Sequence, residues 1–287
     1  MAKLPGNEPL RDRHARLLTS IHAVNALPVA EKEQIYGKLL PARLYSLCGI
    51  SPETFTGCGG EKLVTFIAPD GLGLLRVEVR QRPGDEDLVF FLELADTQFG
   101  QMELSFCIIS DPAAPRFNVD RDSAGKDNCF TTLGRNVPEE FKAMAAGLFP
   151  NQTRRGLRLF GEFFPLFERF VDALGIEMVV AEPLTYDNAI RYEKYGFDYL
   201  TGRRLMLAID QGFAPDGELT RRLDGSTPFR RPGMEKTVRG RSWAIHDGVL
   251  DEPWDGVQIY KMIGVAAGID TFPGRLPEED VPFLTNN

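Results

Sequence analysis

Between residues 151 and 181 the spacing of apolar residues changes from a helical period to a continuous apolar run, and this change separates a predicted helix from a predicted strand. Apolar residues recur at three- and four-residue steps from Leu157 to Leu174, which predicts an amphipathic helix, and Gly175 is typical of a left-handed helix cap. Residues 176–181 are nearly all apolar, with two adjacent valines, which favours a strand buried on both faces. The pattern therefore predicts a long helix followed by a central strand.

The following residues predict a second helix and a further strand. Thr185 or Asp187 is a suitable N-cap, and Gly196 closes the helix before Phe197 starts an extended run, which we expect to continue as a strand over 199–209. Helix, buried strand, helix and strand within about fifty residues indicate a crossover unit, in which helices connect strands of a largely parallel part of a sheet.

Alternating apolar and polar positions ahead of this unit predict a four-stranded antiparallel meander. Leu75, Val77 and Val79 alternate with charged residues, which is the pattern of a half-exposed strand. Turn residues at 69–71 and 82–85 separate the runs. The expected strands are 63–68, 74–82, 88–94 and 102–109.

Helical periodicity dominates the first fifty residues or so. It runs from Leu10 up to Pro28, resumes at Val29, is disturbed by Pro41 and continues to Cys48. Residues 1–59 therefore form an N-terminal helical segment in our interpretation.

The stretch 111–150 is an insertion of loops with one short helix, expected over 139–148. Asn136 and Glu139 have the spacing of a capping box at its start.

Beyond Gly212 the pattern weakens. The stretch 213–242 carries seven basic residues, and a solvated surface loop is a better explanation than a phosphate-facing arm. Residues 243–270 are apolar enough to pack, and 276–287 are expected to be an acidic, frayed tail.

Composition narrows the function classes. The chain has 287 residues, 43% hydrophobic and 26% charged, with a net charge of −8, which is typical of a soluble globular protein and argues against general nucleic-acid binding. No run approaches a membrane span or a signal peptide, so we expect a cytoplasmic protein. The four cysteines and three histidines are scattered, so we expect free thiols and no metal. Ser242 and His246 do not indicate a hydrolase, because the chain has no G-x-S-x-G elbow.

Two short motifs resemble the GNAT N-acetyltransferase superfamily. The first is Asn188-Ala189, Tyr192-Glu193-Lys194 and Gly196-Phe197, which matches the family signature N-A-x-x-x-Y-E-K-x-G-F. The second is Arg154-Arg155-Gly156-Leu157, which resembles the core of that family's phosphate loop and also precedes a long helix. The resemblance implies an α/β (α+β mixed sheet) fold with a GNAT-like central sheet flanked by helices. This domain would cover 60–210 and be followed by an irregular extension, 211–287, that packs on it.

The resemblance also implies roles for particular residues. Asn188 would contact the pantetheine arm of coenzyme A, and the Tyr192 hydroxyl would protonate the departing thiolate. The loop of Arg154, Arg155, Gly156, Leu157 and Arg158 would bind the pyrophosphate at a helix N-terminus, where backbone N–H groups and the helix dipole favour an anion. Arg158 stands where the family has a small residue, so it either pairs with a phosphate or blocks the site.

Acyl transfer to an amine also needs a base, and strand carboxylates are the candidates. Glu103 on the expected fourth strand and Glu93 on the third have the right positions, but the face of each side chain stays open because strand side chains alternate. Asp120 is a further candidate if its segment reaches the cleft. Glu182, after the buried strand, is placed to bind a cationic acceptor.

We therefore expect an acyl-CoA-dependent N-acyltransferase that uses acetyl-CoA or another acyl-CoA and a small amine, as a monomer or a homodimer. Two alternatives stay open. One is a catalytically silent GNAT-like protein that binds a ligand or partner, which Arg158 favours. The other is an acyltransferase with an acyl carrier protein as donor, whose acidic surface would meet the basic stretch 221–241.

Overall fold

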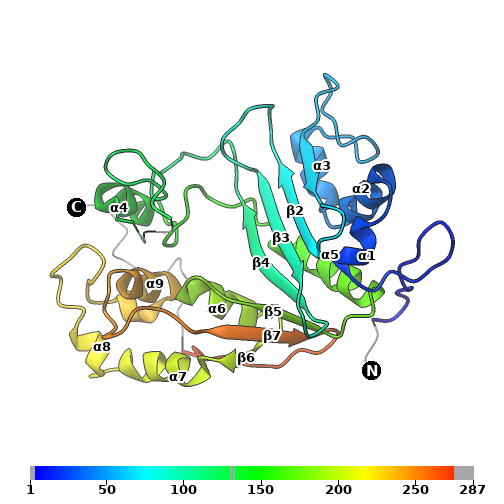
Figure 1. Ribbon diagram of the computed structural model, residues 1–287. Coiled ribbons are helices and arrows are strands. Elements are labelled where there is room, and N and C mark those ends of the chain that lie inside the picture. The colour runs from blue at the N-terminus through cyan, green and yellow to red at the C-terminus, as the bar shows by residue number, and fades with distance from the viewer. Residues whose placement is uncertain (1–3, 130, 132, 275–287) are drawn as a thin grey trace. The chain divides into compact units, whose positions relative to one another are not determined.

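The computed structural model describes residues 4–129, 131 and 133–274. Its strands form a seven-stranded mixed sheet in the order β1-β2-β3-β4-β5-β7-β6, with helices beside it (Figure 1). The chain forms two compact units. Unit 1 contains the described residues up to Ala113, with Gly156–Ala181 and Tyr260–Ala266, and unit 2 contains Ala114–Arg155, Glu182–Ile259 and the described residues from Ala267 on.

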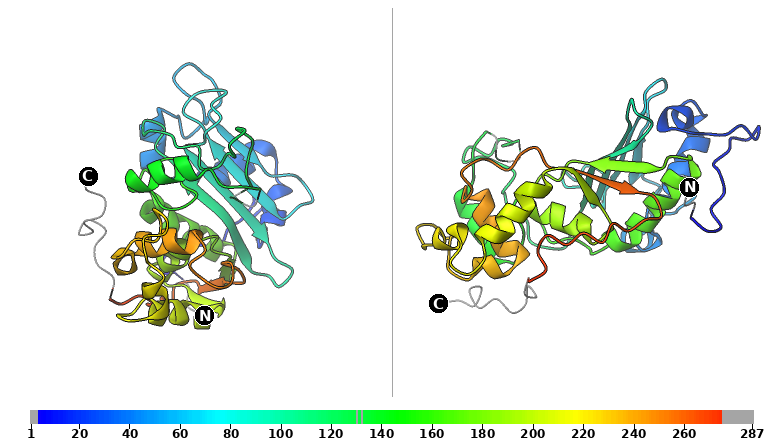
Figure 2. Two further views of the ribbon diagram at one scale, coloured as in Figure 1. Left: turned by 90° about the vertical axis from the view of Figure 1, so that its left-hand side faces the viewer. Right: turned by 90° about the horizontal axis from the view of Figure 1, so that it is seen from below.

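Unit 1 contains the expected meander, which confirms the prediction of four antiparallel strands. These strands are β1 (Val64–Ile67), β2 (Leu74–Val79), β3 (Phe90–Asp96) and β4 (Met102–Ile109), each antiparallel to the next. The two further views in Figure 2 show these cyan strands as one continuous, twisted array. The predicted central strand is β5 (Met178–Ala181), which lies parallel to β4.

The helices of unit 1 are α1 (Ile21–Asn25), α2 (Val29–Gly37), α3 (Ala42–Cys48) and α5 (Phe160–Ala173). Two of them pack on one face of the meander. Phe90 of β3 meets Phe163 of α5 with ring centroids 5.6 Å apart, and Tyr36 of α2 contacts both Phe66 of β1 and Phe170 of α5. Each fully buried aromatic ring contributes about 1.5–3 kcal/mol of transfer free energy. This aromatic layer is part of the core of unit 1.

The first predicted helix is mostly wrong, because only Ile21–Asn25 of it is helical. The Asp12 carboxylate accepts hydrogen bonds from the backbone N–H groups of His14 and Arg16, at 2.8 and 2.9 Å. An aspartate that satisfies nearby backbone groups in this way competes with a helix. The break between α2 and α3 at Pro41 is as predicted.

Helix α5 begins later than its apolar period predicts, at Phe160 rather than Leu157. Its end is as expected, because Gly175 follows it with φ +72°.

Unit 2 contains α4 (Val137–Ala145), α6 (Tyr186–Glu193), β6 (Asp198–Thr201), α7 (Arg203–Gly212), α8 (Glu218–Arg221), the 3₁₀ helix η1 (Met234–Lys236) and α9 (Val238–His246). Strand β7 (Gln258–Met262) starts in unit 2 and ends in unit 1. The core of unit 2 is centred on Trp243, which is fully buried, stacks on Phe229 at 5.2 Å and donates its indole N–H to the Leu148 carbonyl.

Two expectations for unit 2 are wrong. The run 199–209 is not one strand, because Gly202, with φ +88°, ends β6 and starts α7. Met206 and Ile209 are the buried residues of α7, one helical turn apart. The extension after residue 210 is also more regular than expected, since it holds α9 and β7. The tail at 276–287 lies outside the described residues.

Helix α4 confirms the predicted short helix, but its expected capping box is absent in the described structure. Asn136 makes no side-chain cap hydrogen bond and instead donates to the Asn118 carbonyl, while the Glu139 carboxylate accepts from the Asn118 backbone N–H at 3.0 Å. Both side chains therefore hold the loop in front of α4 rather than its own first turn.

Candidate functional site

The loop before α5 approaches the end of β4 closely. A Cβ atom at Gly156 would lie 2.9 Å from the Ile109 carbonyl oxygen, so any side chain there would force the backbone to move. Arg158 has a left-handed backbone, with φ +58°, and Leu159 makes no side-chain cap hydrogen bond to α5. The predicted phosphate loop is therefore an irregular segment that leads into a helix N-terminus without a side-chain cap.

The basic residues of this loop differ in exposure. The Arg154 guanidinium donates to the Ala114 carbonyl, within unit 2. Arg155 and Arg158 are exposed, and Leu157 is half-buried. Two arginines of the predicted set thus present their charge at the surface.

Strands β4 and β5 run together over a short distance only. Their parallel register pairs Met102 with Val179 and Glu103 with Val180, and β5 ends at Ala181, the next residue. Strand β4, by contrast, continues to Ile109. Both strands belong to unit 1, so the second half of β4 extends past the end of its parallel neighbour.

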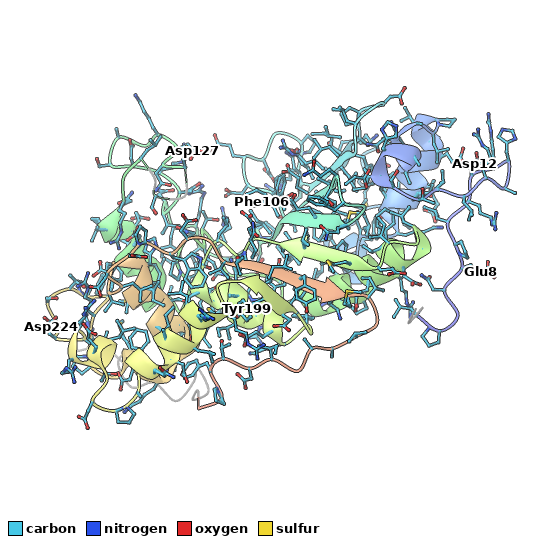
Figure 3. The ribbon with its side chains drawn as sticks, turned by 60° about the horizontal axis from the view of Figure 1, so that its bottom comes forward. Glu8, Asp12, Phe106, Asp127, Tyr199 and Asp224 are labelled. Carbon is cyan, nitrogen blue, oxygen red and sulfur yellow. The ribbon has the colours of Figure 1, made fainter. Side chains whose placement is uncertain are left out.

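A β-bulge in β4 lies close to this point. Glu93 of β3 is opposite Phe106 of β4, whereas the next residue, Leu94, is opposite Leu104, so Ser105 is the extra residue. Without the bulge, residues 103 and 106 would point to opposite faces of the sheet. With it, Glu103 and Phe106 lie on the same face, away from the buried Leu104. Figure 3 labels Phe106 on this strand.

The structure distinguishes the two predicted base candidates, although both lie on this face of the meander. The Glu93 carboxylate accepts two hydrogen bonds from the Arg76 guanidinium, at 2.7 and 3.0 Å. The Glu103 carboxylate accepts one hydrogen bond, at 3.0 Å, from the Ser105 hydroxyl. The oxygen of Glu93 that would contact an amine is occupied by the Arg76 guanidinium, whereas Glu103 has only a neutral partner, so Glu103 is the better candidate.

The two further acidic candidates lie in unit 2 and have partners there. The Asp120 carboxylate pairs with the Arg116 guanidinium through two contacts, at 2.7 and 3.2 Å. Glu182 is exposed and accepts a hydrogen bond of 2.6 Å from the Gln258 side-chain amide. The Arg116 pairing makes Asp120 a weak candidate for a base.

Asn188 and Tyr192 lie on one side of α6, one helical turn apart, and both are half-exposed. The residues between them that face the core are Ala189 and Ile190, which are buried. The Tyr192 ring packs on Phe197 at 4.9 Å. The two motif residues with an implied role thus share the accessible side of their helix.

Glu193, in the same motif, has a structural role that its sequence pattern does not indicate. It is 6% exposed and accepts hydrogen bonds from the Tyr199 hydroxyl and from both the backbone N–H and the hydroxyl of Thr271, at 3.1 and 2.6 Å. Burial raises the pKa of Glu193, and these hydrogen bonds offset the shift only in part. The motif glutamate therefore fixes the segment around Thr271 to α6.

Asp187, at the start of α6, is a second buried acid. Its carboxylate accepts a 3.1 Å hydrogen bond from the Ser242 hydroxyl, and Arg191 lies 3.7 Å away. Burial raises the pKa of Asp187 despite the nearby guanidinium. Ser242 is therefore engaged by Asp187, while His246 lies 3.2 Å from Glu140.

The basic stretch 221–241 is less solvated than expected. Several of its arginines form ion pairs inside unit 2: Arg222 with Asp251 at 2.8 Å, Arg230 with Asp247 at 2.9 Å, and Arg241 with Asp210 at 2.8 Å. Arg241 is also buried between the rings of Phe213 and Phe272. Much of the charge expected to meet an acidic carrier is thus neutralised internally.

The predicted site residues are divided between the units. Unit 1 holds Glu93, Glu103, Gly156, Leu157 and Arg158, and unit 2 holds Arg154, Arg155, Asn188 and Tyr192. Among the described residues, no group of three or more His, Cys, Asp and Glu side chains is arranged to hold a metal ion, and the four cysteines are free.

No helix within residues 4–129, 131 and 133–274 is long and apolar enough to cross a membrane. Comparisons with models of protein families, with curated proteins and with solved structures give no match to this chain.

Proposed function

We propose that this protein is an acyl-CoA-dependent N-acyltransferase that transfers an acetyl or other acyl group to a small amine. The observation that carries the proposal is the early end of β5 beside β4. Where β4 continues past the end of β5, its backbone amide and carbonyl groups on that edge have no strand to pair with. An extended ligand that has its own amide groups can form hydrogen bonds with them. The pantetheine arm of coenzyme A has two such amides.

The length of this edge supports the same ligand. From Glu103 to Ile109 the strand spans about 20 Å at ~3.3 Å per residue. That distance suits an extended pantetheine arm, with the thioester beside Glu103 and the pyrophosphate beyond Ile109. Gly156 lies against the Ile109 carbonyl, so the loop before α5 is at the pyrophosphate end of this path. Arg158 and the N-terminus of α5 follow it in the chain.

In the proposed reaction, the amine nitrogen attacks the thioester carbonyl carbon. Glu103 removes the amine proton, directly or through one water. The bulge at Ser105 is the place on β4 where a backbone N–H outside the regular ladder can stabilise the developing oxyanion. Collapse of the intermediate breaks the C–S bond, and the departing thiolate takes a proton. The family resemblance implies the Tyr192 hydroxyl for this role.

Binding of acetyl-CoA and of free coenzyme A, measured by calorimetry, is the first test. We expect micromolar dissociation constants for both. Arg158→Gly separates the two roles of Arg158, since weaker binding identifies a phosphate ligand and tighter binding identifies a steric block. A folded protein that binds neither compound contradicts the proposal and leaves a carrier-protein donor or a silent module.

Turnover is the second test, followed as free thiol released from acetyl-CoA in the presence of a panel of amines. Glu103→Gln is expected to lower kcat by about 10²–10⁴-fold, the usual contribution of a positioned base. Glu93→Gln, on the same face, is the matched control and should retain most of the activity. Tyr192→Phe should lower kcat by a factor of ten or more with little change in coenzyme A affinity. Equal losses of kcat in Glu103→Gln and Glu93→Gln would show that Glu103 is not the general base.

A further inference from the structure

The face of the meander that carries Glu103, which we call the outer face, holds three strand glutamates, and two of them are paired with arginines. The Arg76 guanidinium lies 2.7 Å from the Glu93 carboxylate. The Arg80 guanidinium lies 2.9 Å from the Glu78 carboxylate. Glu103 has no cationic partner in the part of the chain that the structure describes. The outer face therefore offers one carboxylate to a cation from outside the chain.

The neighbours of Glu103 on the adjacent strands are apolar. Ala95 of β3 lies opposite it, and Val180 of β5 lies beside it in the parallel register. Directly paired residues of neighbouring strands have their side chains on the same face. Ala95 and Val180 are half-buried, and both belong to unit 1. A cation at Glu103 therefore meets methyl groups on two sides, which suits an ammonium on a hydrocarbon chain better than a fully hydrated ion.

An apolar strip continues from Glu103 along β4. The bulge at Ser105 places Phe106 next on the outer face, and Ile108 follows two residues later. The Phe106 ring, labelled in Figure 3, packs edge-on against Phe91 of β3, with centroids 6.3 Å apart. Ile108 is 43% exposed. One carboxylate thus stands at the end of a strip formed by an aromatic pair and an exposed aliphatic side chain.

The charged groups beside this strip are already engaged with one another. Glu93, opposite Phe106, is held by Arg76, so a second ammonium on a ligand finds no open carboxylate there. Glu78, opposite Phe91, is held by Arg80 in the same way. Because both guanidinium groups are used in these pairs, a carboxylate on a ligand finds no open cation either. The face is complementary to a ligand with one ammonium and an uncharged, apolar tail.

We propose that the outer face beside Glu103 is a binding site for a primary amine with a single charge and an aryl-bearing hydrocarbon tail. The inference rests on the proposed function, since it narrows the class of amine acceptor. The ammonium pairs with Glu103, and the tail lies along Phe106 towards Ile108. This strand segment spans at most roughly 16 Å at ~3.3 Å per residue, so a six-carbon chain with a terminal phenyl ring passes Phe106 and reaches the Ile108 side chain. The pantetheine arm follows the edge of β4, so the face stays open to the amine.

Three matched amines test the class on the full-length protein. 6-Phenylhexylamine, 1,6-diaminohexane and 6-aminohexanoate share the chain and one amine and differ only at the far end. They are titrated by calorimetry with and without coenzyme A. 6-Phenylhexylamine is expected to bind about tenfold or more tightly than the other two, because only its tail buries apolar surface without a second charge. Equal binding of the three amines, or tighter binding of either doubly charged one, overturns the inference.

Thiol release from acetyl-CoA separates this inference from the proposed function. Selective binding of 6-phenylhexylamine without any thiol release contradicts the acyltransferase and upholds the amine site. Thiol release with 1,6-diaminohexane or 6-aminohexanoate as the better acceptor supports the acyltransferase and overturns the amine class.

Two exposed isoleucines of the outer face test the location. Ile108→Ser should weaken 6-phenylhexylamine binding about fivefold and leave n-butylamine, whose chain stops short of this residue, unchanged. Ile67→Ser is the matched control and should change neither, because Ile67 is 38% exposed on β1, three strands or ~14 Å from β4. Glu103→Gln should weaken both amines about three- to fivefold by removing the ion pair. Equal effects of the two isoleucine variants, or amine binding that is unchanged in Glu103→Gln, overturn the inference.

Discussion

Two glutamates of unit 2, Glu140 and Glu193, are buried to nearly the same extent, but their pKa values are shifted in opposite directions. Glu140 is 1% exposed and accepts from the Arg135 guanidinium at 3.0 Å, with His246 3.2 Å away. Burial raises the pKa of Glu140, but the hydrogen bonds from His246 and Arg135 outweigh it, and the pKa lies below its ordinary value. Glu193 is surrounded by neutral donors, and its pKa is raised.

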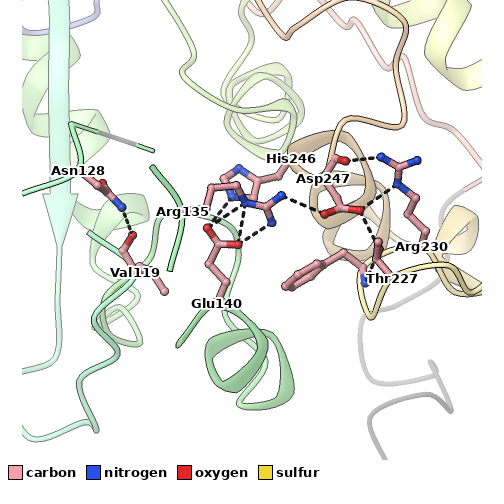
Figure 4. Close-up of polar contacts among 9 residues, drawn as sticks. Val119, Asn128, Arg135, Glu140, Thr227, Arg230, His246 and Asp247 are labelled. Carbon is pink, nitrogen blue, oxygen red and sulfur yellow. Dashed lines mark hydrogen bonds and ion pairs between the residues drawn. The ribbon is translucent and has the colours of Figure 1, made fainter. Parts of the chain in front are cut away.

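The partners explain the difference. The Glu140 cluster continues through Arg135 to Asp247, which also accepts from Arg230 and Thr227, so its charges are compensated (Figure 4). Around Glu193, hydroxyl and amide dipoles solvate the carboxylate without cancelling its charge. Burial alone therefore does not decide the charge state of an acid. The ionic cluster holds α4 to α9, whereas the Glu193 cluster holds α6 to the segment near Thr271.

The largest expected effect is the removal of the Glu140 carboxylate. Glu140→Ala leaves the Arg135 guanidinium partly buried with one partner fewer, and breaking a buried pair in this way costs about 3–5 kcal/mol. Urea denaturation at pH 7 measures it. Glu218→Ala, which breaks the exposed pair with Arg222, is the control and should cost less than about 1 kcal/mol. Similar losses in both variants would show that the Glu140 cluster is not specially stabilising.

The Glu140 effect also has a defined pH dependence. Because the folded-state pKa is lowered, the stabilisation is fully present above the unfolded pKa of about 4.3 and is lost as pH falls through the folded value. The difference between wild type and Glu140→Gln should therefore shrink in acid. A difference that stays constant from pH 7 to pH 3 contradicts the lowered pKa.

Glu193→Gln is expected to change the folding stability less than Glu140→Ala does, and its difference from wild type should vary with pH in the opposite direction. A raised folded-state pKa means that the wild type loses stability as pH rises from about 4.3 through the folded value. The amide keeps an acceptor oxygen and carries no charge, so the variant should lack this decline and stay within about 1 kcal/mol of wild type at pH 7. Thermal melts from pH 4 to pH 8 measure the two slopes. Parallel curves for the two proteins would contradict the raised pKa.

Thr271→Val should have the smallest effect. It keeps the shape of the side chain but removes the hydroxyl that donates to Glu193, which costs about 1 kcal/mol. If the segment positions α6, coenzyme A affinity should also fall while the melting temperature changes little. Thr220→Val, which removes a hydroxyl bond to the Ala214 carbonyl, is a control with similar stability loss and no effect on affinity.

The sequence predicts those elements whose side chains carry a clear period. The meander, the break at Pro41 and the cap at Gly175 follow from alternation, proline geometry and a left-handed glycine, which are local properties. The apolar run after Tyr199 fits either a strand or a helix by its pattern, and Gly202 decides between the two by ending β6 and starting α7.

The candidate site was predictable only where its signal is local. The sequence predicts a helix between residues 185 and 196, and the motif residues Asn188 and Tyr192 lie in α6. Glu193 could not be assigned its partner, because Thr271 is 78 residues away. The choice between Glu93 and Glu103 also depends on a bulge and on Arg76, a cross-strand neighbour, and neither follows from strand alternation.

The division of the chain into units has a consequence for biosynthesis. Going from the N-terminus, the polypeptide passes between the units five times, so neither unit is a continuous segment. Unit 1 is complete only when Tyr260–Ala266 has been added, and β7 is the neighbour that covers the free edge of β5. A nascent chain that stops before Gln258 exposes this edge, which can pair with other chains. Co-translational folding of unit 1 is therefore expected to finish late, and chains that end before Gln258 are expected to aggregate. Sedimentation of such truncated chains after their release from the ribosome measures this aggregation.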